Sequence, residues 1–83
     1  MKINIETTFD IGDVVYVAEH YYNYYADKEP YTITDIIIDI NNNRMSVMYA
    51  VQQHTRIDRV TEQYVFRTYE ECTMWCKEQN GIL

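Results

Sequence analysis

Hydrophobic and polar residues alternate with the two-residue period of β-strands in several segments of this chain. A β-branched and aromatic run begins after a turn that needs the backbone freedom of Gly12. Counting by twos places Val15 and Val17 on one face of this strand and Tyr16 on the other. Residues 31–40 are dense in isoleucine and threonine and predict a second strand. The pattern therefore predicts a fold that is mainly β.

A hairpin is expected around three consecutive asparagines, at 41–43, because asparagine tolerates the left-handed backbone angles of tight turns. The residues after this turn alternate again, and their apolar members are Met45, Val47, Tyr49 and Val51. Residues 55–60 are a candidate for a further short strand, in which Ile57 is expected to point inward. Short antiparallel strands are therefore expected through residue 60.

One α-helix is expected near the C-terminal end, over residues 68–79. Thr68, followed three residues later by Glu71, is the capping-box pattern of a helix start. Spacings of three and four then define one helical face, which holds Cys72, Trp75, Cys76 and Gln79. The helix is expected to end near Asn80, with Trp75 and Cys72 pointing into the core.

Residues 18–30 are unusually aromatic. They show no sustained period and end at the only proline, which indicates a long loop or an open ribbon. The chain has nine tyrosines, more than a small core can use, because a buried tyrosine hydroxyl needs a partner. Some rings of this segment could close the end of the fold. The others are expected in solvent, as anchors of a protein interface or as stacking surfaces for a base.

Length and composition predict a single domain, residues 1–83, because 47% hydrophobic and 24% charged residues favour a folded chain over a disordered one. No apolar run approaches the 18 residues of a membrane span, and the start lacks the apolar stretch of a signal peptide. Two cysteines form no disulfide framework, so buried thiols in a reduced compartment are expected. These features predict a cytoplasmic protein.

The chain is acidic, with 13 acids against seven bases and a net charge of −6. The surplus lies in the first half, where eight acids meet two bases up to residue 41, while five of each follow. Such a balance works against direct nucleic-acid binding, which needs a basic surface. It favours either solubility or an acidic face that meets a basic partner.

Catalytic patterns are not found. Ser46, the only serine, lies in a strand without a glycine-rich elbow, and two glycines cannot build a phosphate-binding loop. Asp35 and Asp39 could share a strand face, but two solvated carboxylates are ordinary there. We therefore expect no catalytic residue, no metal ion and no cofactor.

Two segments carry a family resemblance. Residues 9–17, Phe-Asp-Ile-Gly-Asp-Val-Val-Tyr-Val, resemble the start of a small SH3-like barrel. Residues 62–72 resemble the closing segment of small phage and prophage proteins of Gram-positive bacteria, in which a Phe-x-Thr-x-Glu-Glu step leads into a terminal helix. The resemblance spans residues 9–79. It implies an α+β, mainly β fold, an SH3-like barrel of four to five antiparallel strands with a C-terminal helix.

The expected function is non-enzymatic binding. Similarity to phage proteins implies an inhibitor from a phage or mobile element that occludes the basic surface of a host defence protein, as anti-CRISPR proteins do with a CRISPR effector. The expected contact residues are Tyr21, Tyr22, Tyr24, Tyr25, Asp27, Glu29, Asp35 and Asp39. One alternative is a nucleotide or small-molecule sponge, with an inward arginine from among Arg44, Arg56, Arg59 and Arg67. Another is a small structural or nucleic-acid-associated barrel. The oligomeric state stays open.

Overall fold

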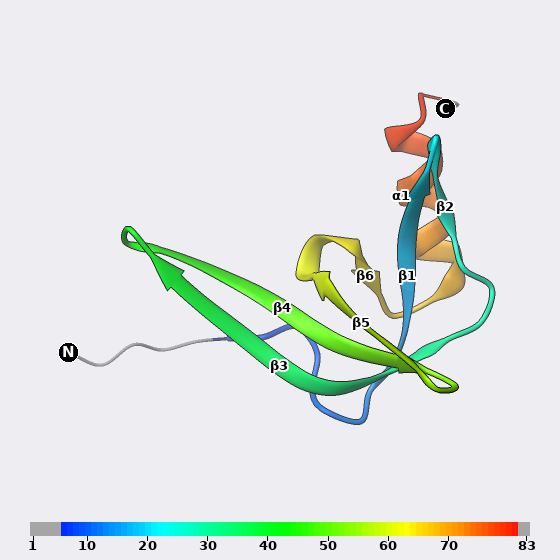
Figure 1. Ribbon diagram of the computed structural model, residues 1–83. Helices are drawn as coiled ribbons and strands as arrows, with labels where there is room; N and C mark the ends of the chain where they lie inside the picture. Colours follow the sequence, from blue (N-terminus) through cyan, green and yellow to red (C-terminus); the bar gives the residue numbers. More distant parts are fainter. Residues whose placement is uncertain (1–5, 82–83) are drawn as a thin grey trace.

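Antiparallel strands and one C-terminal helix make up the computed structural model, which describes residues 6–81 (Figure 1). The elements are β1 (Val14–Tyr21), β2 (Asn23–Ala26), β3 (Tyr31–Asn41), β4 (Arg44–Gln53), β5 (Arg56–Thr61), the 3-10 helix η1 (Glu62–Tyr64), β6 (Val65–Phe66) and α1 (Tyr69–Gln79). The prediction of a mainly β fold with one terminal helix is confirmed.

The strands follow the order β2-β1-β3-β4-β5, and β6 also pairs with β1. Strand β1 is the hub, because consecutive parts of it pair with different neighbours: Val14 and Val15 with β3, Tyr16 and Val17 with β6, and Ala18–Tyr21 with β2. The hairpin expected around the asparagines is present as β3 and β4, which pair from Thr32↔Gln52 to Asn41↔Arg44.

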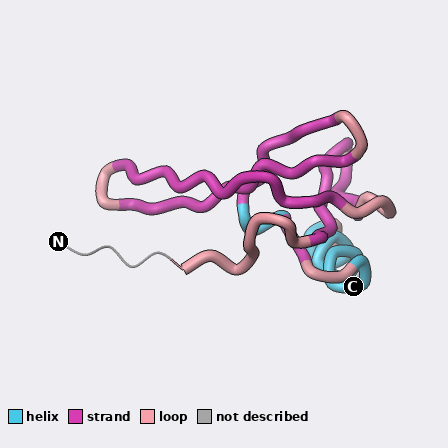
Figure 2. The backbone as a smooth tube through the Cα atoms, turned by 90° about the horizontal axis from the view of Figure 1, so that it is seen from below, coloured by secondary structure: helices cyan, strands magenta, loops and turns pink. Residues whose placement is uncertain are grey.

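The expected closed barrel is wrong. Within residues 6–81, no strand pairing joins β5 to β2 or to β6, so the sheet stays open. Strand β6 has only two residues and pairs with β1 alone. The ends of β3 and β4, residues 38–47, pair only with each other and project as a two-stranded arm (Figures 1 and 2).

One core cluster lies between the sheet and the segment before β1. It consists of Phe9, Val15, Val17, Tyr31, Ile33, Tyr49, Val51 and Val65. Val15 and Val17 share the buried face, as expected from their spacing. At one side the buried hydroxyl of Tyr49 accepts a hydrogen bond from the Phe9 N–H, at 3.3 Å, and donates one to Glu62.

A second cluster lies beneath α1. Thr68 caps the helix as predicted, its side-chain oxygen accepting from the Glu71 N–H at 3.1 Å. Cys72 and Cys76 are buried against Ala18 of β1, so the expected burial of both thiols is confirmed. The expectation for Trp75 is only partly met, because its ring is half-buried at the edge of this cluster.

Two other core expectations are wrong. Ile57 is 60% exposed, because the register pairs it with Gln52 on the outward face, whereas the next inward position of β5 is Asp58, opposite Val51. Met45 has the same parity as Tyr49 but is exposed, because it lies on the arm beyond the reach of the core. Strand alternation therefore identified the faces but not what covers them.

Candidate functional site

The aromatic segment forms an ordered hairpin. The second half of β1 and all of β2 pair from Ala18↔Ala26 to Tyr21↔Asn23, and the chain reverses at Tyr22 (Figure 1). Of the two alternatives for residues 18–30, the ribbon is therefore correct for residues 18–26, which we name the tyrosine hairpin. Residues 27–30 connect it to β3.

Its four tyrosines have different environments. Tyr22 is 86% exposed, Tyr21 71% and Tyr25 47%, whereas Tyr24 is half-buried. The rings of Tyr21 and Tyr22 lie edge to face, with centroids 4.7 Å apart. They form an exposed aromatic pair at the tip.

Tyr22 adopts a backbone conformation that does not suit it. Its φ is +62°, in the left-handed region where a Cβ clashes with the following carbonyl. The turn between β3 and β4 uses the same region at Asn42 and Asn43, residues that tolerate it. A bulky side chain at such a position is an outlier, and burial does not explain this one.

Tyr24 fastens the hairpin to α1. Its ring meets that of Trp75 edge to face, at 5.0 Å, and stacks with that of Tyr64, at 6.1 Å. The side chain of Asn80, just after the helix, accepts a hydrogen bond from the Tyr24 N–H at 2.9 Å and donates one to the Tyr24 carbonyl at 2.8 Å. Tyr24 is therefore a packing residue and not part of an exposed contact surface.

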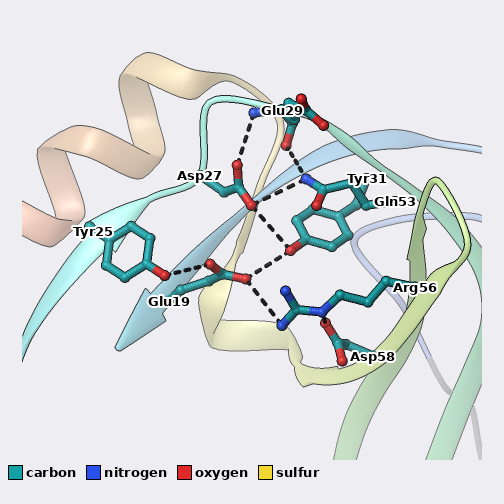
Figure 3. A network of polar contacts seen from close by, with 8 residues as sticks. All are labelled: Glu19, Tyr25, Asp27, Glu29, Tyr31, Gln53, Arg56 and Asp58. Carbon is teal, nitrogen blue, oxygen red and sulfur yellow. Dashed lines mark hydrogen bonds and ion pairs between the residues drawn. The ribbon is translucent and has the colours of Figure 1, made fainter. Parts of the chain in front are cut away.

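A polar network holds the other side of the hairpin (Figure 3). Glu19 of β1 accepts hydrogen bonds from the hydroxyls of Tyr25, at 2.9 Å, and Tyr31, at 2.8 Å, and lies 3.8 Å from the Arg56 guanidinium. Burial and its hydrogen bond to Glu19 raise the pKa of Tyr31, and the separate hydrogen bond from Tyr25 to Glu19 raises the pKa of Tyr25. Both hydroxyls therefore stay protonated and keep donating.

Asp27 and Glu29 belong to the same network. Asp27 accepts from the Tyr31 hydroxyl at 3.3 Å, from the Gln53 amide at 3.2 Å and from the Glu29 N–H at 3.0 Å. Glu29 lies 2.7 Å from His54 at an exposed position. The structure thus brings these two predicted contact residues near the tyrosines, but Asp27 primarily holds the connection to β3 in place.

Asp35 and Asp39 are placed elsewhere. Both are exposed, and Asp39 pairs with Ser46 on the arm, which projects away from the tyrosine hairpin (Figures 1 and 2). The eight predicted contact residues therefore do not form one surface. Glu19, which joins Tyr25 to Tyr31, was not among them. Glu19 lies directly opposite Tyr25 in the β1–β2 pairing, so a hairpin centred on Tyr22 would have predicted this cross-strand pair.

A cleft of about 360 Å³ opens between the tyrosine hairpin and β5. Its polar lining includes Glu19, Tyr25, Tyr31, Arg56, Asp58 and Arg59. Arg56 lies 2.6 Å from Asp58, and this carboxylate is the main cause of its raised pKa. Two arginines against two carboxylates leave no net positive charge to attract a phosphate.

The cysteines do not provide reactive thiolates. Burial raises the pKa of Cys72 to about 12 and also raises the pKa of Cys76. A protonated, buried thiol is a poor nucleophile and a poor metal ligand. Among residues 6–81, no group of three or more His, Cys, Asp or Glu side chains is arranged to hold a metal ion.

In the part of the chain that the structure describes, no helix is both long and apolar enough to span a membrane. Comparison of the chain with family models, with curated proteins and with solved structures gives no match, so its function has to be inferred from geometry and charge.

Proposed function

We propose that this chain is a non-enzymatic protein-binding module and that Tyr21 and Tyr22, at the tip of the tyrosine hairpin, are its main contact with a partner. The observation that carries the proposal is the strained and exposed placement of Tyr22. Left-handed geometry costs a residue with a Cβ about 1–2 kcal/mol, and such strain concentrates at functional sites. Neither turn geometry nor packing accounts for a tyrosine there.

The tip suits protein recognition because it is already ordered. Asn80 and the rings around Tyr24 hold one side of the hairpin, and the Glu19 network holds the other. Tyrosine offers a large contact area and a polar hydroxyl with little rotamer entropy to lose. A pre-organised aromatic pair therefore loses less entropy on binding than a mobile loop.

Charge supports a basic partner. The net charge of −6 would speed association with a positively charged surface and disfavour acidic competitors. Host defence proteins that bind nucleic acid, such as a CRISPR effector, present positively charged surfaces. We therefore retain inhibition of such a protein in the bacterial cytoplasm, by a phage-encoded chain, as the most specific form of the proposal.

We also propose that the fold is SH3-like. It is supported by the strand order β6-β1-β3-β4-β5 and by the 3-10 helix η1 between β5 and β6. Under this assignment β2 is an insertion that lengthens the first connection and presents the tyrosines. Folds of this size host unrelated functions, so the function rests on the surface and not on the fold.

Nucleotide binding is the second candidate. Tyr25, Arg56 and Arg59 line one cleft, as this alternative requires. The carboxylates of Glu19 and Asp58 oppose it, because both lie within 4 Å of Arg56 and offset the charge that would meet a phosphate. A saturable heat signal on titration with ATP would favour this candidate over protein binding.

The test compares baits that differ only at exposed side chains. The wild-type chain, a Tyr21→Ser/Tyr22→Asn double variant and an Ile40→Thr control are incubated with bacterial lysate at low salt, and native mass spectrometry identifies what they retain. Ile40 is exposed on the arm, so the control removes an apolar side chain away from the tip. We expect a protein bound by wild type and control, released at high salt and missing from the double variant.

The same variants separate binding from folding. Asparagine suits the left-handed turn, so the double variant should melt at or above the wild-type temperature. Equal capture by all three baits would contradict a role for the tyrosine tip. A double variant that unfolds would show that the rings support the fold instead.

A further inference from the structure

A second surface, separate from the tyrosine hairpin, lies along the outer side of α1. It is a groove of about 460 Å³ lined by Phe66, Glu70, Glu71, Met74, Trp75 and Glu78. Its apolar floor is formed by Phe66, Met74 and Trp75, and Met74 is 55% exposed. We name this surface the α1 groove.

Helical spacing explains how the α1 groove arises. Glu71, Trp75 and Glu78 follow an i, i+4, i+7 pattern, so they lie along one stripe of the helix. The buried stripe, with Cys72 and Cys76, lies beside it. Phe66 of β6 packs against Trp75, with ring centroids 5.7 Å apart, and supplies the other wall.

The rim of the α1 groove has one sign of charge. All its ionisable residues are glutamates, and among residues 6–81 none of them takes part in an ion pair within 4 Å. Lys77 does not line the groove itself. It lines an adjoining depression with Tyr69 and Thr73, and that depression shares Glu70 and Met74 with the groove. An apolar floor with an acidic rim is complementary to an apolar side chain flanked by basic ones.

Helix stability accounts for only part of this charge. Glu70 and Glu71 lie in the first turn, where carboxylates are favoured by the helix dipole. Glu78 is one residue before the end of the helix, where a negative charge opposes the dipole. Its position is therefore unfavourable for the isolated helix but completes the acidic rim at the far end of the groove.

We propose that the α1 groove binds a basic amphipathic helix of a partner protein. In this arrangement, two adjacent apolar side chains of the partner rest on Met74 and Trp75, and a lysine or arginine beyond each end pairs with Glu71 or Glu78. The two glutamates are seven residues apart, about 10 Å along the helix axis, so basic residues at i and i+7 match them. This mode needs no contact with the tyrosine tip and does not depend on the function proposed for it.

The experiment uses Trp75 as its own probe, because it is the only tryptophan and lies in the groove. The full chain is titrated with a 15-residue alanine-based helical peptide that has lysines at i and i+7 and leucines at i+3 and i+4. A second peptide replaces both lysines with glutamate. We expect a saturable change in Trp75 emission with the lysine peptide that weakens at high salt, and at least tenfold weaker binding of the glutamate peptide.

Variants test the rim directly. Glu71→Gln/Glu78→Gln should weaken binding of the lysine peptide at least tenfold, and Glu78→Lys alone should weaken it similarly while favouring the helix dipole. Asp35→Gln/Asp39→Gln removes the same charge from exposed positions on β3 and should leave binding unchanged. Circular dichroism checks that each variant is folded.

Three results would overturn the proposal. The emission of Trp75 could stay constant with the lysine peptide, or respond equally to both peptides, which would mean that apolar contact alone drives binding. The emission could also change with protein concentration in the absence of peptide, which would identify a second copy of this chain as the occupant. Capture experiments with Tyr21 and Tyr22 variants are unaffected by any of these results, so the two proposals fail independently.

Discussion

Replacing Asn80 by alanine should detach the tyrosine hairpin from α1 without unfolding either element. The Asn80 amide makes two hydrogen bonds to the backbone of Tyr24, at 2.9 and 2.8 Å, across 56 positions of sequence. A net contribution of about 0.5–1.5 kcal/mol for each bond predicts a loss of about 1–3 kcal/mol in the free energy of unfolding. For a domain of this size, that loss lowers the melting temperature by roughly 4–8 °C per kcal/mol.

The measurement combines urea unfolding, followed by circular dichroism, with the emission of Trp75. Tyr24 packs on Trp75, so a detached hairpin should expose the indole and shift its emission to the red. A loss of less than about 0.5 kcal/mol in the free energy of unfolding, without an emission shift, would refute the claim that Asn80 holds the tyrosine hairpin against α1. Substitutions of surface residues alone reach that size.

Asn80→Asp sharpens this test. The carboxylate can still accept from the Tyr24 N–H, but its second oxygen faces the Tyr24 carbonyl and repels it. We expect the aspartate variant to be no more stable than the alanine variant at pH 7. At pH 3 a protonated carboxyl donates again, so the aspartate variant should become the more stable of the two. A pH-independent difference between the variants would contradict the donor role.

Two further predictions concern the core. Trp75→Ala should lower the free energy of unfolding by about 2–3 kcal/mol, measured by urea unfolding. The loss is smaller than the 3–5 kcal/mol typical of fully buried rings, because Trp75 is only half-buried against Tyr24, Tyr64 and Phe66. A variant as stable as wild type would exclude Trp75 from the second cluster. Burial raises the pKa of Cys72 from 9.0 and that of Tyr49 from 10.0, each to about 12, so the fold favours the protonated forms. Their contribution is complete below about pH 9 and is lost as the pH rises toward 12, so unfolding free energy should fall by about 3 kcal/mol between pH 7 and pH 10.5, with Cys72 as the larger contributor. Constant stability over that range would show that these groups are solvated.

Local patterns in the sequence predicted the main hairpin and the terminal helix, but they left residues 18–30 open between a loop and a ribbon. The asparagines at 41–43, the alternation from 45 to 51 and the Thr68 cap correctly predicted a hairpin and a terminal helix, because turn preference, strand period and capping act within a few residues. The excess of tyrosine predicted that some rings of residues 18–30 are exposed, but not that these are Tyr21, Tyr22 and Tyr25.

Predictions from the sequence were wrong where a distant element determines whether a side chain is buried. Tyr24 differs from its neighbours only because Asn80 and Trp75 reach it from α1. Ile57 satisfies strand preference, but the register of β5 against β4 turns it outward. The open sheet was also not predicted, because closure depends on whether distant strands such as β5 and β6 pair, and no such pairing is present within residues 6–81.

The amino-acid sequence alone therefore determined the longer strands, the helix, the buried thiols and the acidity of this protein, since each depends on composition or on neighbours along the chain. Only the tertiary structure decided which polar groups are satisfied internally. It pairs Glu19 and Asp27 with Tyr31 inside a network, leaves the glutamates of α1 around an apolar groove, and separates Asp39 from the tyrosines. The physical reason is that contacts between distant segments depend on how the elements pack, and that packing is fixed by the whole chain at once.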